Sequence, residues 1–496
     1  MNDFSHNTGY QLHSIGTGVL SHSMDIQALF GDHLNTLQQQ LDQALAGTNT
    51  AADAVLIHSG SYHSHYADDQ GKPFRAWGHF LRWIPVDRAD QFVLLRPGVR
   101  PLFIALIPQD YWHDSKLDIQ HWWAAHVDVK VISRLQELPA TLIQGLKLTF
   151  LGENSSLAES LGVASTLINP PALLNWLDYE RAFKTPYELQ RLAEANAHAL
   201  TGHQAAHDAF LSGQDEFDIH MAYLSACRVL ENELPYPNIV GINDHAAILH
   251  YQHKSRHNAH SDDRPENKVL LIDAGCRANS YCSDITRTWC RPGVHPLFSG
   301  LLAGMQKLQS TVIQDIRTGM DFGDLHHHAH FYLAQLLSDS GLCRGNAEEL
   351  VTAGITQSFL PHGLGHLLGL QVHDVGGRLA DREGHMRAPP AHYPALRNTR
   401  RIEENMVFTI EPGLYFIPML LDQLKVTTAG KLVDWSAVSL MMPLGGIRIE
   451  DNIWVQKDGV HNLTRRPLLP LLSQPTPLQA GDFSAHWSDK WDTTRA

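Results

Sequence analysis

Carboxylates and histidines in the second half of the chain recur where apolar runs end, which is where metal-binding side chains are often held. Four short segments carry them: residues 269–288, 361–374, 407–413 and 446–451. Carboxylate oxygens are hard ligands that suit manganese or similar divalent ions, and an imidazole among them extends the choice to cobalt, iron or zinc. One such segment alone is weak support, because a charged residue at a strand end is usually just solvated. Four together predict a metal centre.

The first segment contains two aspartates, Asp273 after an apolar run and Asp284 before a second one. Both runs are typical of strands, and a turn near Ala278 and Asn279 would make them a hairpin. That register places Asp273 directly opposite Asp284, with Cβ atoms about 4.5–5.5 Å apart. Two carboxylates so close repel each other unless a cation lies between them. The alternative is two unrelated aspartates at strand ends.

The other segments supply the remaining ligands and polar groups. His362, His366 and His373 lie among glycines and can offer one imidazole ligand and two further polar groups, although a surface loop is the alternative in a chain with 32 histidines. Glu411 follows an apolar strand and precedes a Pro-Gly turn. Arg448 and Glu450 are two residues apart in a predicted strand, so their side chains point to the same face.

A second group of histidines is predicted to be without function. The four histidines between residues 326 and 330 lie in a helical pattern, where consecutive side chains point in different directions, so we expect a solvated helix face. The same interpretation applies to His58, His63 and His65.

The elements that must position the centre divide the chain into domains. With 496 residues, two domains are expected. We predict an extension over residues 1–23, an α/β domain over 24–170, a second domain over 171–465 and a tail over 466–496. The α/β domain begins with a helix from Ile26 to Leu45, followed by strands near residues 55–57, 92–95, 102–107 and 148–151. In the second domain, Thr185, Pro186 and Glu188 predict a helix start with a capping box, and the helix should reach Leu211.

Composition limits the partners and the compartment. The 38 basic and 52 acidic side chains give a net charge of −14, which argues against nucleic acid as a partner. Five scattered cysteines without a CxxC pair are typical of a reducing compartment. The first residues lack the pattern of a signal peptide, and no apolar run approaches the length of a membrane span. We therefore expect a cytoplasmic protein that does not bind membranes.

The order of the motifs adds a resemblance to a known family. The chain resembles the pita-bread metallopeptidases (aminopeptidase P, creatinase, methionine aminopeptidase), and most closely the bacterial Xaa-Pro dipeptidases of the prolidase and organophosphorus acid anhydrolase type. The likeness runs from about Met24 to Arg465 and rests on TPYELQRLAEAN, LPYPNIV, AILHY, LLIDAG, SDITRTW, PHGLGHLLGLQVHDVGG, FTIEPGLYF and GGIRIEDN. It implies a creatinase-like α/β N-terminal domain and an α+β pita-bread catalytic domain.

The resemblance also implies roles for single residues. The metal ligands would be five residues that hold two divalent ions, with manganese expected: Asp273, Asp284, His366, Glu411 and Glu450. The substrate would be surrounded by six further residues: His250, His362, His373, Arg448, Tyr236 and Asp69. Asp69 lies in a loop that, in similar prolidases, reaches the neighbouring subunit's site, so a homodimer is expected.

The implied reaction is hydrolysis of the bond before a C-terminal proline by a metal-activated hydroxide, with Glu411 moving the proton and His373 stabilising the oxyanion. A side activity on organophosphate triesters is implied as well. Arg448 either grips the substrate carboxylate or neutralises the acidic cage, and His250 and His362 cannot be ranked. The competing functions are an aminopeptidase P acting on longer peptides and a non-catalytic peptide-binding module.

Overall fold

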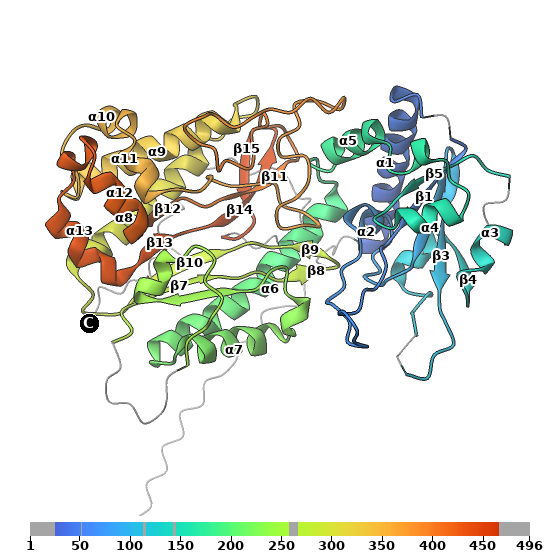
Figure 1. Cartoon of the computed structure of the whole chain (residues 1–496), viewed down its shortest axis with the longest axis horizontal. Coiled ribbons are helices and arrows are strands. Elements are labelled where there is room, and N and C mark those ends of the chain that lie inside the picture. The colour runs from blue at the N-terminus through green and yellow to red at the C-terminus, as the bar shows by residue number, and fades with distance from the viewer. Residues whose placement is uncertain (1–24, 51, 113–115, 142–144, 257–265, 466–496) are drawn as a thin grey trace, which may run out of the picture.

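The computed structural model describes residues 25–50, 52–112, 116–141, 145–256 and 266–465. These residues form two domains side by side, the N-terminal one at the right of Figure 1 and the larger one at the left. The predicted extension and tail lie outside the described residues. In the described part of the chain, no helix combines the length and the apolar character that crossing a membrane requires.

The N-terminal domain is a mixed sheet covered by helices. Its strands are β1 (Ala54–His58), β2 (Phe92–Arg96), β3 (Val99–Leu106), β4 (Asp128–Ile132) and β5 (Leu148–Leu151), in the order β4-β3-β2-β1-β5. The strand β1 runs antiparallel to β2 and parallel to β5. Four of these strands were predicted from apolar runs. The strand β4 was missed because Asp128 and Lys130 interrupt its apolar pattern.

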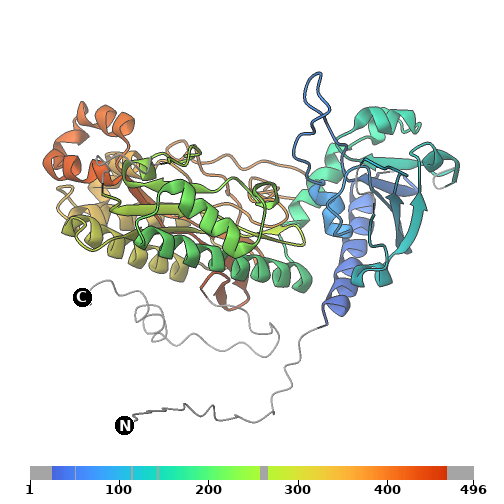
Figure 2. The same cartoon turned by 90° about the horizontal axis from the view of Figure 1, so that it is seen from below.

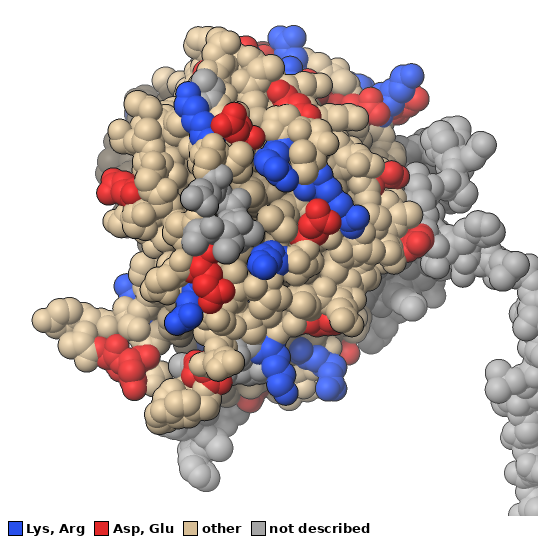
Figure 3. Space-filling model, turned by 90° about the vertical axis from the view of Figure 1, so that its right-hand side faces the viewer, with Lys and Arg blue, Asp and Glu red and all other residues tan. Residues whose placement is uncertain are grey.

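Helices α1 (Ile26–Gly47) and α5 (Pro171–Glu180) pack together on one face of this sheet, with α2 (Gly78–Trp83) beside them. The short helices α3 (Glu137–Thr141) and α4 (Ser155–Ser160) complete the domain. The outer face of the domain carries interspersed basic and acidic side chains, and Figure 3 shows no continuous basic patch on it.

The long helix α6 (Pro186–Leu211) begins the second domain where the sequence predicts it. Thr185 accepts a hydrogen bond from the backbone of Glu188, whose carboxylate accepts one from the backbone of Thr185. Pro186 occupies the first helical position, where its missing N–H costs nothing. Gly213 has a φ of +82°, which suits the chain reversal after the helix.

The strands of the second domain form two main sheets. One has the order β10-β7-β6 and consists of β6 (Ile239–Ile242), β7 (Val269–Asp273) and β10 (Thr286–Cys290). The other has the order β11-β14-β15 and consists of β11 (Val407–Ile410), β14 (Asp451–Gln456) and β15 (Gly459–Asn462). The pair β12 (Gly413–Tyr415) and β13 (Gly446–Arg448) continues the second sheet, and the hairpin β8 (Arg277–Ala278) and β9 (Tyr281–Cys282) continues the first.

Both faces of these sheets are covered by helices. Alternate residues of β7 point to opposite sides: Leu270 and Ile272 pack with α6 and α7 (Glu216–Cys227), whereas Val269 and Leu271 pack with α8 (Pro296–Asp315) and α9 (Phe322–Asp339). The helices α10 (Ala347–Thr352), α11 (Ile355–Phe359), α12 (Pro418–Lys425) and α13 (Trp435–Met441) surround the end remote from the N-terminal domain (Figure 1). The catalytic domain predicted from the sequence is therefore confirmed as a layered α+β domain.

The predicted pairing of the two aspartates is wrong by two residues. Asp273 lies opposite Thr286, and Gly275 takes the position opposite Asp284. The turn is centred on Asn279 and Ser280, which both have positive φ (45° and 74°), the conformation of a tight two-residue hairpin turn. Because the error is an even number of residues, both aspartates still point to the same face of the sheet.

The prediction of a solvated histidine face is also wrong in part. His326 and His330 are buried on the inner side of α9, and their Nε2 atoms lie 3.2 Å apart. A spacing of four residues places them on one face of the helix, unlike consecutive positions. His58 is buried as well and pairs with Asp90 at 3.2 Å, while His63 and His65 are exposed as expected.

Candidate metal centre

Neighbouring strands bring the acidic side chains of three segments into one row. Asp273 lies opposite Thr286, and Thr286 forms a β-bridge with Glu450. Ile410 pairs with Asp451, and Gly413 pairs with Arg448. The same register across the gap between these two pairs places Glu411 opposite Glu450. Opposed residues point to the same face of a sheet. The row Asp273–Thr286–Glu450–Glu411 therefore crosses from one sheet to the other.

His366 and Asp284 lie next to this row and complete the set of predicted metal ligands. The ligand atoms of Asp284, His366 and Glu450 lie within 4.8 Å of one another, and His366 Nε2 is 3.3 Å from Asp284 Oδ2 and 3.8 Å from Glu411 Oε1. The segment that carries His366 lies directly against β11 because residue 365 is a glycine. A Cβ there would come within 1.9 Å of the Thr409 carbonyl oxygen.

Burial makes these carboxylates costly to ionise without a cation. Loss of solvent, reinforced by the charge of Asp284, raises the pKa of Glu450 well above its ordinary value. The same loss of solvent raises the pKa of Glu411 to about 7 and that of Asp273 to about 6. Burial also works to raise the pKa of Asp284, but hydrogen bonding and charge from His366 outweigh it and hold that pKa below its usual value.

The donor set fits a pair of divalent metal ions. Four carboxylates and one imidazole converge, and buried Asp273 Oδ1 has no hydrogen-bond partner among the described residues. The Nδ1 atom of His366 lies 3.0 Å from the Leu367 carbonyl, to which it can donate, so that Nε2 faces the carboxylates with a free lone pair. A carboxylate oxygen left without a partner in a buried acidic group indicates the position of a cation.

Arg448 directs its guanidinium toward the protein. Its Nη2 donates to Asp273 Oδ2 at 2.7 Å, its Nη1 to the Tyr415 hydroxyl at 2.9 Å, and its Nε to Thr286 Oγ1 at 3.1 Å. Only 4% of the side chain is exposed, so its donors are used within the centre. These contacts favour the second interpretation of Arg448, in which it offsets the charge of the acidic cage.

Three of the other predicted substrate residues lie around the centre. The Tyr236 hydroxyl donates to Asp284 Oδ1 at 2.6 Å. The ring of His373 is perpendicular to that of His366, with centroids 4.3 Å apart, and burial lowers the pKa of His373 to about 4. His362 lies 3.7 Å from Glu411 and contacts the Tyr415 hydroxyl at 2.9 Å, and burial lowers its pKa to about 3. Both imidazoles are thus neutral at neutral pH.

A cavity of about 490 Å³ opens onto the centre from between the two domains. The catalytic domain contributes Asp273, Asp284, His250, His373 and Tyr236 to its walls, among other residues. The N-terminal domain contributes Arg75, Ala76, Trp77, Gly78 and Glu153. A cavity of this size holds a small organic ligand such as a short peptide.

Asp69 is the predicted site residue that neither lines this cavity nor contacts the centre within the described part of the chain. It lies in the exposed segment 62–70, which folds back on itself through a β-bridge between Ser64 and Gly71. Figure 2 shows this dark blue loop standing out from the N-terminal domain. Within one chain, the structure does not bring Asp69 together with the other predicted residues.

Three contributors escaped the sequence prediction. Thr286 donates to Glu450 Oε2 at 2.7 Å, and Tyr415 joins His362 to Arg448. Arg397 is exposed, and its charge lowers the pKa of His373. In the described part of the chain, the Arg397 side chain makes no ion pair. Alternation along the strand 286–290 could have indicated Thr286, whereas Arg397 lies in a loop without a sequence signal.

An α/β domain beside a layered domain whose sheets carry carboxylates and a histidine defines the class of two-domain pita-bread metallopeptidases. The chain belongs to metallopeptidase family M24, whose model matches residues 190–457, and residues 28–179 match the Xaa-Pro dipeptidase N-terminal domain. The chain is 40% identical to an Xaa-Pro dipeptidase of Shewanella pealeana over 441 residues, covering 88% of this chain and 97% of that protein.

Another relative and two solved structures agree with this assignment. An Xaa-Pro dipeptidase of Aeromonas hydrophila is 42% identical over 444 residues, covering 88% of this chain and 98% of that protein. Aminopeptidase P of Escherichia coli shares the fold in its complex with the inhibitor Pro-Leu and in a zinc-substituted product complex. Each has a TM-score of 0.65 and 21% identity, covering 86% of this chain and 95% of that one.

Proposed function

We propose that the protein is an Xaa-Pro dipeptidase that hydrolyses the bond before a C-terminal proline, with two manganese ions held by Asp273, Asp284, His366, Glu411 and Glu450. The observation that carries this proposal is the convergence of these residues, from four distant segments, beneath a cavity of about 490 Å³. Relatives about 40% identical over nearly their whole length carry the name Xaa-Pro dipeptidase.

The ions would supply a hydroxide nucleophile at neutral pH by lowering the pKa of a shared water. Glu411 accepts a proton from the attacking water and delivers it to the proline nitrogen. That delivery is needed because an imide nitrogen carries no hydrogen and would otherwise leave as an unstable anion. Glu411 is placed for both steps, since its carboxylate lies among the proposed ligands, 3.8 Å from His366 Nε2.

The surrounding side chains orient the substrate and stabilise the transition state. His373 is neutral, so one ring nitrogen can donate to the oxygen of the attacked carbonyl. Tyr236 fixes the orientation of Asp284 through the 2.6 Å hydrogen bond. Arg448 holds Asp273 and limits repulsion within the cage. His250 lies at the wall of the cavity and is available for the substrate's polar ends.

We further propose a cytoplasmic homodimer in which Asp69 binds the substrate's amino group in the partner's site. The exposure of segment 62–70 supports this role, because a carboxylate standing out from the body can reach another molecule. The side activity on organophosphate triesters remains a prediction that no residue here tests.

The decisive test is hydrolysis of a set of Xaa-Pro dipeptides and Xaa-Pro-Xaa tripeptides by chelated enzyme, repeated after addition of manganese, cobalt or zinc. We expect activity to vanish on chelation, to return best with manganese, and to favour dipeptides. Faster cleavage of tripeptides would indicate an aminopeptidase P instead. Full metal binding without hydrolysis of any peptide would indicate a non-catalytic binding module.

A further inference from the structure

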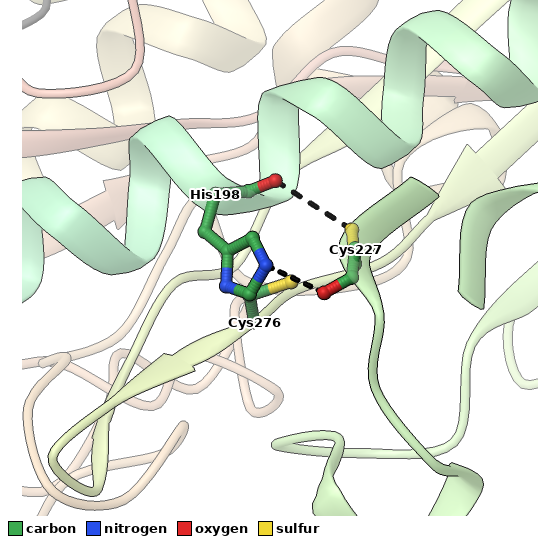
Figure 4. A group of neighbouring side chains, drawn as sticks. All are labelled: His198, Cys227 and Cys276. Atoms are coloured by element: carbon green, nitrogen blue, oxygen red, sulfur yellow. Dashed lines mark hydrogen bonds between the residues drawn. The ribbon is translucent and has the colours of Figure 1, made fainter. Parts of the chain in front are cut away.

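A second group of metal-binding side chains lies outside the carboxylate centre. It consists of His198 on α6, Cys227 at the end of α7 and Cys276 in the segment that follows β7. Figure 4 shows the imidazole of His198 beside both sulfur atoms. One ligand atom from each residue lies within 4.8 Å of the other two. Three distant parts of the sequence thus contribute two thiols and one imidazole to one point.

The separations are close to those that a tetrahedral ion requires. Zinc binds thiolate sulfur at about 2.3 Å and imidazole nitrogen at about 2.0–2.1 Å, which places neighbouring ligand atoms about 3.5–3.8 Å apart. From separations of up to 4.8 Å, the three donors therefore have to approach one another by at most about 1.3 Å. Thiolates with an imidazole suit soft ions of filled d shell, whereas the carboxylate centre suits hard ions.

The surroundings prepare one sulfur for ionisation. A hydrogen bond from Cys276 lowers the pKa of Cys227 to about 7, and the Thr201 hydroxyl, 3.9 Å away, acts in the same direction. The same shared proton raises the pKa of Cys276. The Tyr223 hydroxyl lies 3.6 Å from the Cys276 sulfur. A metal ion would replace the shared proton, as ions do at thiolate sites.

Packing leaves room for the sulfur atoms and access for an ion. Residue 202 is a glycine, and a Cβ there would come within 2.5 Å of Cys227 Sγ. Both cysteines are 1% exposed, whereas His198 is only partly buried and borders the solvent. The Nε2 atom of His198, which lies beside the sulfurs, donates a 2.6 Å hydrogen bond to the Cys227 carbonyl, so an ion bound through this nitrogen would replace its proton and that hydrogen bond.

We propose that His198, Cys227 and Cys276 form a binding site for a soft d¹⁰ metal ion such as Zn²⁺ or Cd²⁺, separate from the carboxylate centre. The site does not depend on the proposed hydrolytic function. A bound ion would join α6, α7 and the segment after β7, so it stabilises the folded chain by mass action.

The site is also connected to the carboxylate centre through the hairpin. The backbone N–H of Cys276 donates to Ser283 Oγ at 3.0 Å, and the backbone N–H of Ser283 donates to the Cys276 carbonyl at 3.0 Å. Ser283 directly precedes Asp284, and Cys276 lies three residues after Asp273. An ion that pulls Cys276 toward α7 therefore acts on the strand segments that hold both aspartates.

The test is titration of the full-length, manganese-loaded protein with Cd²⁺, followed by ultraviolet absorption. Thiolate–cadmium charge transfer absorbs there, whereas carboxylate and imidazole ligands do not, so exchange at the carboxylate centre is silent. We expect the band to saturate at one equivalent per chain and to disappear in Cys227→Ser and Cys276→Ser. The matched control Cys343→Ser changes another buried cysteine and should keep the band.

A second measurement needs no variant. Prolonged alkylation of the native protein, which reaches the buried Cys227 and Cys276 when the fold opens locally, should be slowed by Cd²⁺ at these two cysteines but not at Cys290, as mapped by mass spectrometry. Absence of the band, its persistence in both serine variants, or unchanged alkylation would overturn the proposal. Three free thiols in the denatured, unreduced protein, instead of five, would overturn it as well, because the pair would then be a disulfide.

Discussion

Glu411 carries the largest chemical demand of any residue in the centre, because it is proposed both to bind metal and to move the proton. Its carboxylate lies 3.8 Å from His366 and 3.7 Å from His362, and burial raises its pKa to about 7. A carboxylate held within reach of the attacking water can accept a proton from it and pass the proton on. This combination distinguishes Glu411 from Glu450, whose carboxylate accepts a hydrogen bond from Thr286.

Replacing Glu411 with Gln should lower kcat by about 10²–10⁴-fold with little change in KM, because the amide cannot take up the proton. The measurement is steady-state hydrolysis of an Xaa-Pro dipeptide with metal content determined on the same sample. Glu404→Gln is the matched control, since Glu404 is an exposed glutamate in the segment before β11, outside the centre. A near-normal kcat at full metal occupancy would contradict the role as a base.

Arg397 and Arg448 differ in their contacts, so their replacement should affect the preference for dipeptides over tripeptides differently. Arg448 is fully engaged with Asp273, Tyr415 and Thr286, whereas Arg397 is exposed near His373. We propose that Arg397 binds the substrate's carboxylate. Arg397→Ala should then reduce the preference for dipeptides over tripeptides by about tenfold or more, since a lost charged contact costs about 1.5–3 kcal/mol. Arg448→Ala should lower kcat/KM for both substrates and leave their ratio within about threefold.

The kinetics of both arginine variants should be measured on the same peptide pair. A selectivity lost only in Arg448→Ala would assign the grip on the carboxylate to Arg448 instead. The sequence left these two roles of Arg448 open because its position in a strand says which face it occupies, but not which neighbours its guanidinium meets. A cluster of carboxylates was easier to predict than the role of Arg448, because four segments pointed to it together, whereas a single carboxylate at a strand end is usually just solvated.

At the scale of elements, helix ends and apolar strands were predictable but register was not. The start of α6 follows from local chemistry, since Thr185, Pro186 and Glu188 satisfy their own backbone. The register of the hairpin in the first sheet depends on which two residues form its turn with positive φ. If the turn is displaced by one residue along the chain, the partner of each strand residue changes by two positions. Asn279 and Ser280 take those positions, so Asp273 meets Thr286. The row Asp273–Thr286–Glu450–Glu411 depends on the register of each strand pair that it crosses.

Glu188 also joins the two domains through the start of α6. Its carboxylate, 2% exposed, accepts hydrogen bonds from Arg82 of α2 at 3.3 Å and from the Tyr281 hydroxyl at 3.1 Å. Glu188→Gln should destabilise the protein by about 3 kcal/mol, because a buried Arg82 then loses its counter-charge. Urea unfolding measures this loss. The control Glu194→Gln, on a partly exposed pair with Arg191 along the same helix, should change stability by less than about 1 kcal/mol.

The same pair predicts acid sensitivity. Burial works to raise the pKa of Glu188, but the charges of Arg82, His33 and Lys184 outweigh it and lower the pKa to about 2. A lowered carboxyl pKa stabilises the fold above the ordinary value of 4.5, and this contribution is lost as the pH falls toward 2. The stability difference between wild type and Glu188→Gln should therefore shrink by about 1 kcal/mol between about pH 5 and about pH 3.5. A constant difference would contradict it.

At the scale of the whole molecule, the cavity is built by both domains. Arg75 of the N-terminal domain reaches across it and donates to the Pro235 carbonyl at 2.8 Å, beside Tyr236. Trp77 and Glu153 line the same space. The N-terminal domain thus closes the site over a short substrate, which agrees with a preference for dipeptides. The loop that carries Asp69 is exposed and contributes no residue to the lining of this cavity.

The exposure of that loop leads to a complementation experiment with two defective chains. If Asp69 acts in the partner's site, a dimer of Asp69→Ala with Glu411→Gln contains one intact centre, because the second chain supplies the aspartate to the first. Coexpression of the two variants should restore about one quarter of the wild-type activity, since half of randomly paired dimers are mixed and each has one working site. As control, wild type coexpressed with a chain carrying both substitutions forms mixed dimers with no complete site, so only its wild-type dimers are active.

Purification of the mixed dimers through two different tags separates the two cases. Active mixed dimers in the first pairing and inactive ones in the control establish action in trans, whereas the reverse pattern would place Asp69 in its own chain's site.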